Sequence, residues 1–181
     1  VDLYLAEAEL LRAHGSPNEV RQLYATALKA HPDSVELLYA KALLAAEDGR
    51  VGDAEAAFKR VLAKEPDHAD ALNALGYTLA DLADRHKEAL GYITRALKLR
   101  PDSPAFLDSM GWVQYRMGNH AVALDYLRRA YATLKDGEVA AHLGEVLWVT
   151  GDRDEARRVW QEGEAADPDN AVLRATLQRF R

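Results

Sequence analysis

Residues 66–102, PDHADALNALGYTLADLADRHKEALGYITRALKLRPD, decide the fold of this 181-residue chain. The stretch begins and ends with Pro-Asp, a dipeptide that starts at Pro32, Pro66, Pro101 and Pro168. The first three prolines are 34 and 35 residues apart, and the fourth follows after 67, which is two periods. A fixed period of this length indicates a chain of stacked repeats.

Each period contains two helical patterns. In the first half of the quoted stretch the apolar side chains recur at helical spacing, at Leu72, Leu75, Gly76 and Leu79. The second half does the same at Ala89, Ile93, Ala96 and Leu97. Spacings of three and four residues place these side chains on one face of a helix. Each repeat therefore reads as two helices of about 13 residues, and each Pro-Asp ends the second one.

A helix pair of this period resembles the tetratricopeptide repeat. The signature of its first helix is clearest in the third and fifth repeats and partial in the fourth, at Leu107, Met110 and Gly111. The resemblance implies an all-α, right-handed superhelical solenoid of about five helix pairs with a concave inner surface. We expect repeats and a C-terminal capping helix at 1–34, 35–68, 69–103, 104–136, 137–170 and 171–181.

Local signals mark the ends of the helices. Ser16 to Glu19 reads as a capping box with proline at the first helical position, and Asp152 to Glu155 resembles another. Gly49, Gly118 and Gly151 suit the left-handed residue after a helix. The third repeat lacks this glycine and has an extra residue within 81–86, so we expect a longer turn there.

Small residues on the helical faces predict close helix packing. Gly76, Gly111, Gly144, Ala89 and Ala123 stand where a larger side chain would clash with the neighbouring helix. A single helix pair cannot bury its apolar face alone, so stability depends on stacking of neighbouring repeats.

The composition excludes several classes of protein. With 49% hydrophobic residues the chain is too apolar to be disordered. Its formal charge is -6, and 23 basic residues are scattered among 29 acidic ones, unlike a nucleic-acid-binding stripe. It has no cysteine and begins with Val1 without a signal segment, so we read it as a piece of a longer protein, with any targeting or anchoring signal elsewhere.

We expect the first helix of each repeat to line the concave surface and to supply the contacts with a protein partner. The candidate binding residues are Tyr39, Asn73, Tyr77, Asp108, Trp112, Tyr115, Arg116, His142, Glu145 and Trp148. Aromatic rings supply contact area at low entropy cost, and polar groups between them can fix the backbone of a peptide.

Ordinary structural roles compete with this interpretation. Trp148 fits the core as well as the groove, and Asn73 fits a solvated helix position as well as a ligand contact. For Trp112 and Tyr77 the groove is favoured, because their neighbours already supply the stacking face. Trp160 occupies the large stacking position of a second helix and is assigned to the core.

Specific ligand signatures are missing from the sequence. One variety of this fold binds a C-terminal carboxylate through lysine and asparagine, but the matching positions here show no lysine and no repeated asparagine. No histidine has a second one at metal-ligand spacing, and neither a nucleophile elbow nor a phosphate loop occurs. We therefore predict no metal, no cofactor and no enzymatic activity.

Three strings are more specific than the general repeat: LNALGYTLAD at 72–81, LDSMGWVQYRMG at 107–118 and AAHLGEVLW at 140–148. Together they resemble the C-terminal part of bacterial outer-membrane tetratricopeptide lipoproteins. This resemblance implies an adaptor that delivers peptidoglycan hydrolases to a periplasmic carboxyl-terminal processing protease. It also implies a place at the periplasmic face of the outer membrane, with membrane contact only through a lipid anchor outside this chain.

Two alternatives remain open at this point. The solenoid could be a structural module that self-associates through its edges or scaffolds another envelope complex. It could also assist an enzyme through a hidden pair of catalytic carboxylates, which would require a compact pocket with converging acids.

Overall fold

The computed structural model describes residues 1–180, which form helices joined by short connections, with no strand. The helices are α1 (Asp2–His14), α2 (Pro17–Ala30), α3 (Val35–Glu47), α4 (Val51–Lys64), α5 (Ala69–Leu82), α6 (His86–Leu99), α7 (Pro104–Arg116), α8 (His120–Thr133), α9 (Gly137–Thr150), α10 (Arg153–Ala166) and α11 (Ala171–Phe180). The predicted all-α class is confirmed. None of these helices combines the length and the apolar character that crossing a membrane requires.

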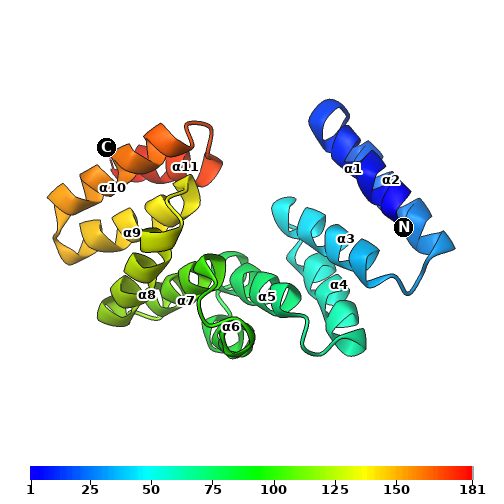
Figure 1. Cartoon of the computed structure of the whole chain (residues 1–181), viewed down its shortest axis with the longest axis horizontal. Coiled ribbons are helices and arrows are strands. Elements are labelled where there is room, and N and C mark those ends of the chain that lie inside the picture. Colours follow the sequence, from blue (N-terminus) through cyan, green and yellow to red (C-terminus); the bar gives the residue numbers. More distant parts are fainter. Residues whose placement is uncertain (181) are drawn as a thin grey trace.

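The helices stack in consecutive pairs along a curved path. Within the pairs α3 packs on α4, α5 on α6, α7 on α8 and α9 on α10, while α5, α7 and α9 also touch one another in sequence. The pairs curve around an opening that separates the N-terminal helices from α10 and α11 (Figure 1). The predicted repeat solenoid is thus confirmed, whereas the residue boundaries of the repeats stay a prediction.

Glycines allow the paired helices to approach closely, as the sequence predicts. A Cβ atom added at Gly76 would lie 2.5 Å from Ile93 Cγ1, and one added at Gly111 would lie 2.5 Å from Leu127 Cγ. At Gly144 the added atom would meet the indole ring of Trp160. These three positions let the first helix of each pair rest directly on large side chains of the second.

The turns inside the pairs agree with the sequence in three places and differ in one. Gly49, Gly118 and Gly151 have φ angles of 69°, 83° and 103°, which confirms their left-handed conformation. The prediction of a longer turn in the third repeat is wrong. Only residues 83–85 separate α5 from α6, as many as separate α3 from α4, and Asp84 takes the left-handed position with φ 53°. Aspartate tolerates this conformation better than most residues, so glycine is not required.

The capping signals are confirmed only in part. The hydroxyl of Ser16 accepts from the amide of Glu19, and the Glu19 carboxylate accepts from the amide of Ser16, which is the predicted capping box. The prediction of a second capping box at Asp152 is wrong, because the side chain of Asp152 makes no capping hydrogen bond. An aspartate that the sequence analysis missed, Asp136, caps α9 by accepting from the amide of Val139 at 2.9 Å.

The last helix, α11, closes the C-terminal end of the stack. Leu173 is 1% exposed, and Leu177 and Phe180 are half-buried against the same core cluster. The exposed side of α11 faces the opening of the curve, where it forms part of the groove described next.

Candidate functional site: an inner groove of aromatic and acidic residues

The inner surface of the curve holds two adjoining cavities of about 860 and about 650 Å³. Both are lined by Tyr77, Asp81 and Val172, so they form one continuous depression, here called the inner groove. The smaller cavity extends toward α3 and is called the N-terminal half. The larger one extends over α7, α9 and α11 and is called the C-terminal half.

Nine of the ten predicted binding residues line the inner groove. The N-terminal half is lined by Tyr39, Asn73, Tyr77 and Asp108, and the C-terminal half by Tyr77, Trp112, Tyr115, Arg116, His142 and Glu145. Their position on the concave surface agrees with the sequence analysis, while their role in binding stays a prediction.

The structure does not bring Trp148 into this groove. Its ring lies 5.5 Å from that of Trp160 and 5.9 Å from that of Phe180, between centroids. Arg153 and Arg157 also lie over this ring, with guanidinium carbons 5.0 and 5.2 Å from the ring centroid. The predicted core position of Trp160 is confirmed, because its side chain is buried.

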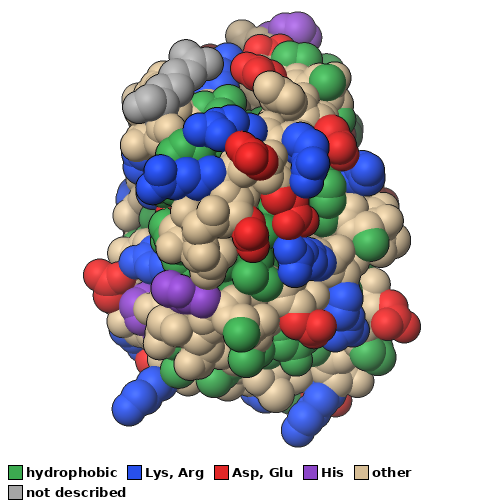
Figure 2. All heavy atoms as spheres, turned by 90° about the vertical axis from the view of Figure 1, so that its left-hand side faces the viewer, with side chains coloured by type: hydrophobic (Ala, Val, Ile, Leu, Met, Phe, Trp, Pro, Cys, Tyr) green, Lys and Arg blue, Asp and Glu red, His purple; other side chains and the backbone are tan. Residues whose placement is uncertain are grey.

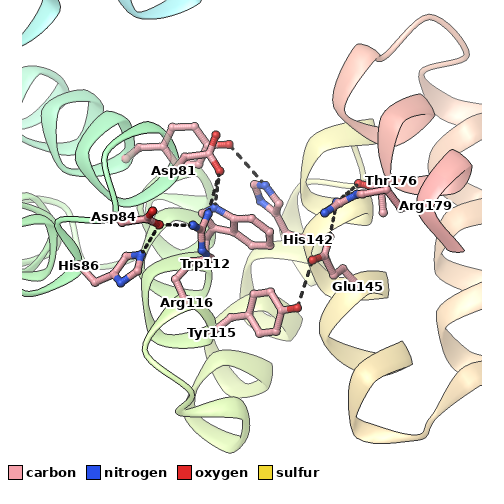
Figure 3. A network of polar contacts seen from close by, with 11 residues as sticks. Asp81, Asp84, His86, Trp112, Tyr115, Arg116, His142, Glu145, Thr176 and Arg179 are labelled. Atoms are coloured by element: carbon pink, nitrogen blue, oxygen red, sulfur yellow. Dashed lines mark hydrogen bonds and ion pairs between the residues drawn. The ribbon is translucent and has the colours of Figure 1, made fainter. Parts of the chain in front are cut away.

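Trp112 belongs to the groove wall and to the packed interior at once. The residue is only 6% exposed, and its indole NH donates to Asp81 Oδ1 at 3.0 Å. Its ring stacks on that of His142 with centroids 4.2 Å apart and planes inclined by 21°. Trp112 therefore orients α7 relative to α5 and α9 (Figure 3), and its replacement would disturb packing as well as any bound ligand.

A buried acid–imidazole pair lies beneath this wall. Asp108 on α7 and His142 on α9 are 5% and 2% exposed, and His142 Nδ1 lies 2.9 Å from Asp108 Oδ2. Burial by itself lowers the pKa of His142, but the neighbouring carboxylates of Asp108, Glu138 and Asp81 outweigh it, so this pKa is raised. The pair is thus held together by charge as well as by a hydrogen bond.

Two further groups complete this buried cluster. The hydroxyl of Tyr77 lies 3.4 Å from His142 Nε2, and burial raises the pKa of Tyr77. Burial and the nearby Asp108 also raise the pKa of Glu138, although His142 opposes the shift. Because Tyr77 stays a protonated phenol, its contact with His142 does not create an activated nucleophile.

Asp108, Glu138 and His142 could also hold a metal ion. Each offers one ligand atom, and these atoms lie within 4.8 Å of one another. Two carboxylate oxygens and one imidazole nitrogen suit a divalent transition metal. Sequence spacing missed the set because Asp108 comes from another repeat. The pair Glu138 and His142, four residues apart on one helix, was the available signal.

In the C-terminal half, the helices are joined by paired polar side chains (Figure 3). The hydroxyl of Tyr115 donates to Glu145 at 3.1 Å, and Arg179 of α11 binds the same carboxylate at 2.5 Å. Burial and Glu145 raise the pKa of Tyr115 to about 12. Arg116 binds Asp84 at 2.6 Å on the opposite wall. The sequence of residues 171–181 predicts only a capping helix, and it does not indicate that Arg179 and Thr176 line the groove.

Charged side chains of both signs also lie outside the groove. The end of the molecule formed by the C-terminal repeats shows acidic and basic side chains interspersed over its surface (Figure 2). This distribution agrees with the sequence-based argument against a basic stripe.

Comparison with known proteins agrees with this architecture. The chain is 48% identical over 145 residues to the TPR repeat-containing protein PA4667 of Pseudomonas aeruginosa; the match covers 80% of this chain but only 25% of that protein. A second relative is the small glutamine-rich tetratricopeptide repeat-containing protein 2 of Mycosarcoma maydis. It is 31% identical over 84 residues, and the match covers 46% of this chain and 24% of that protein. The chain therefore spans about a quarter of the length of these relatives.

Solved structures share the fold at low identity. A thermophilic TPR protein of Thermus thermophilus superposes with a TM-score of 0.81 at 24% identity, covering 96% of this chain and 95% of that one. The Pseudomonas aeruginosa protein pilF superposes with a TM-score of 0.75 at 20% identity, and the superposition covers 95% of this chain and 78% of that one. The tetratricopeptide repeat profile matches residues 5–63, 39–104 and 109–171, and the chain belongs to the tetratricopeptide repeat family.

Proposed function

We propose that the chain is a non-enzymatic adaptor that holds an extended segment of a partner protein in its inner groove. The observation that supports this most directly is the groove itself, a continuous depression lined by tyrosine and tryptophan rings with polar groups between them. Such surfaces combine large contact areas with hydrogen bonds that fix a bound backbone. Family membership supports a protein partner rather than a small molecule.

The test requires a change that fills the groove without touching the core. Ala175 on α11 is exposed and lines the C-terminal half, so Ala175→Tyr adds bulk to the groove at a helix surface. Gln178 on the same helix is exposed and does not line either half, and Gln178→Tyr serves as the matched control. Both variants are expected to fold, because neither residue is buried.

The probe is a phage-displayed library of random dodecapeptides, selected on the wild-type chain. Selected peptides are then synthesised with a fluorescent label, and their affinity is measured by anisotropy. We expect Ala175→Tyr to weaken binding by about tenfold or more, as filling a buried interface pocket does, and Gln178→Tyr to leave it unchanged. Equal affinity for the two variants, or no selectable peptide, would refute binding in the groove.

A narrower proposal follows from the resemblance of residues 72–81, 107–118 and 140–148 to outer-membrane tetratricopeptide lipoproteins. In it, the partner is a peptidoglycan hydrolase or the carboxyl-terminal processing protease that degrades it, at the periplasmic face of the outer membrane. A reconstituted degradation assay tests this. We expect the chain to accelerate hydrolase cleavage and Ala175→Tyr to remove the effect. An unchanged cleavage rate on adding the chain would exclude the adaptor role.

A second candidate function is self-association through the N-terminal edge. Leu3 and Leu10, seven residues apart on α1, are 81% and 65% exposed, more than any other large hydrophobic side chain among the described residues. Light scattering over a range of concentrations should then reveal dimers that disappear in Leu3→Ser/Leu10→Ser. A monomer at all concentrations would remove this candidate.

A further inference from the structure

The two halves of the inner groove differ sharply in charge. The N-terminal half is lined by six carboxylates and, among the described residues, by no lysine or arginine. The carboxylates are those of Glu47, Asp70, Asp81, Asp108, Asp136 and Glu138. The C-terminal half, by contrast, has Arg116 and Arg179 beside its acids.

Three of these six carboxylates are already neutralised by arginines outside the N-terminal half. Glu47 pairs with Arg12, Asp70 with Arg100, and Asp81 with Arg116. The other three are close together at the junction of α7 and α9.

Of the remaining carboxylates, Asp108 pairs with the imidazole of His142. Asp136 is engaged with a backbone amide as the cap of α9, and Glu138 forms no ion pair with any described residue. Buried or half-buried carboxylates are stable when a cation compensates them. At this junction the described residues thus place three carboxyl groups against a single imidazole, without a lysine or an arginine.

The N-terminal half also offers a hydrogen-bond acceptor that has no partner in the described part of the chain. The side-chain oxygen Oδ1 of Asn73 is buried and has no hydrogen-bond partner among the described residues. Carboxylates and an amide oxygen are acceptors, so the missing counterpart is a donor. Tyr39 and Tyr77 line the same half, and their rings can pack against a cationic side chain.

We propose that the N-terminal half of the groove binds an arginine or lysine side chain of the partner's extended segment. The inference rests on the proposed groove function and specifies the chemistry of its ligand. Arginine and lysine are pure donors, with five and three N–H groups and no acceptor, and their positive charge is opposite to that of the carboxylates at the junction. Apolar parts of the segment would lie along Leu43, Ala74 and Val139, which line the same half.

Glu138→Gln is the informative variant. It replaces a carboxylate with an amide of almost the same shape, at a residue that forms no ion pair with any described residue. Glu164→Gln on α10 is the matched control, since it makes the same chemical change at an exposed residue that lines neither half of the groove. The probes are the selected dodecapeptides, together with versions in which each arginine or lysine is replaced by glutamine.

We expect the selected peptides to share one arginine or lysine position. Replacing that residue with glutamine should weaken binding about tenfold or more, and Glu138→Gln should weaken the parent peptide similarly while hardly affecting the glutamine version. Glu164→Gln should bind like the wild type. Affinity should also fall as sodium chloride is raised, because the contact is electrostatic.

The possible outcomes separate this inference from the broader proposal. Peptides that lack a shared basic position, or that bind Glu138→Gln as tightly as wild type, would overturn the inference but leave the groove function intact. Failure to select any peptide would overturn both. Binding that requires added Zn²⁺ and is lost with EDTA would overturn it in favour of a metal ion at Asp108, Glu138 and His142.

Discussion

Replacement of Gly144 by alanine tests how the C-terminal repeats pack. An added Cβ at this position would lie 2.5 Å from both Cδ1 and Cε2 of Trp160 and closer still to its Nε1. The indole is enclosed by other side chains. It is 4% exposed and packs against Trp148 and Phe180, whose ring centroids are 5.5 and 5.7 Å away.

Two opposing terms set the size of the effect. Overpacking a well-packed core costs about 1–3 kcal/mol, and the rigid, enclosed ring of Trp160 places this site at the upper end. Replacing glycine with alanine inside a helix stabilises the folded state by about 1 kcal/mol. The net loss in the free energy of unfolding is therefore about 2 kcal/mol, which corresponds to a decrease of about 4–8 °C in Tm for a chain of this size.

Gly91 provides the matched control within the same protein. It lies in the interior of α6, is exposed, and an added Cβ there would meet no atom within 4 Å. Gly91→Ala should therefore stabilise the protein by about 1 kcal/mol and raise Tm by about 2–4 °C. Urea unfolding followed by circular dichroism, together with thermal scans, measures both variants.

A double-mutant cycle isolates the clash itself. If contact with the indole causes the loss, Gly144→Ala should cost less in a Trp160→Phe background, because the smaller ring leaves room for the methyl group. Equal Tm shifts for Gly144→Ala and Gly91→Ala, or an unchanged cost in the Trp160→Phe background, would refute the packing argument.

Three further predictions concern other parts of the stack. Hydrogen bonds from Arg85 and Lys59 lower the pKa of Glu55 to about 2, and a carboxyl NMR titration should show this value in the wild type. In Arg85→Ala the pKa should rise but stay below the unperturbed value, because Lys59 remains. The associated stability is present above the unperturbed pKa and is lost as pH falls toward about 2. Leu173→Ala removes a side chain that is 1% exposed under α11 and should destabilise by about 2–5 kcal/mol, seen as faster hydrogen exchange in α11. Ser16→Ala removes the hydroxyl of the capping box and should cost about 0.5–2 kcal/mol in urea unfolding, with little effect from the same change at Ser103, whose side chain makes no capping hydrogen bond.

The sequence by itself determined the repeat architecture. The Pro-Asp period and the glycines at Gly76, Gly111 and Gly144 are local or periodic constraints. A proline cannot continue a helix beyond its first turn, and a helix can approach its neighbour closely only through a small residue. The same logic placed most of the binding candidates on the inner surface, because position within the repeat fixes the direction of a side chain.

Only the tertiary structure decided which side chains meet. Asp108 and His142 are 34 residues apart, and their contact depends on the distance and rotation between α7 and α9. Trp148 lies outside the groove, where Phe180 of α11 packs against its ring. Asp84 takes the left-handed turn position that glycine takes in other repeats, and the sequence of the turn did not indicate this conformation. The uneven charge of the groove likewise comes from residues of several repeats, and these come together only when the helices stack. Periodicity determines the direction of each side chain along its own helix, whereas the neighbour it meets is set by packing between helices.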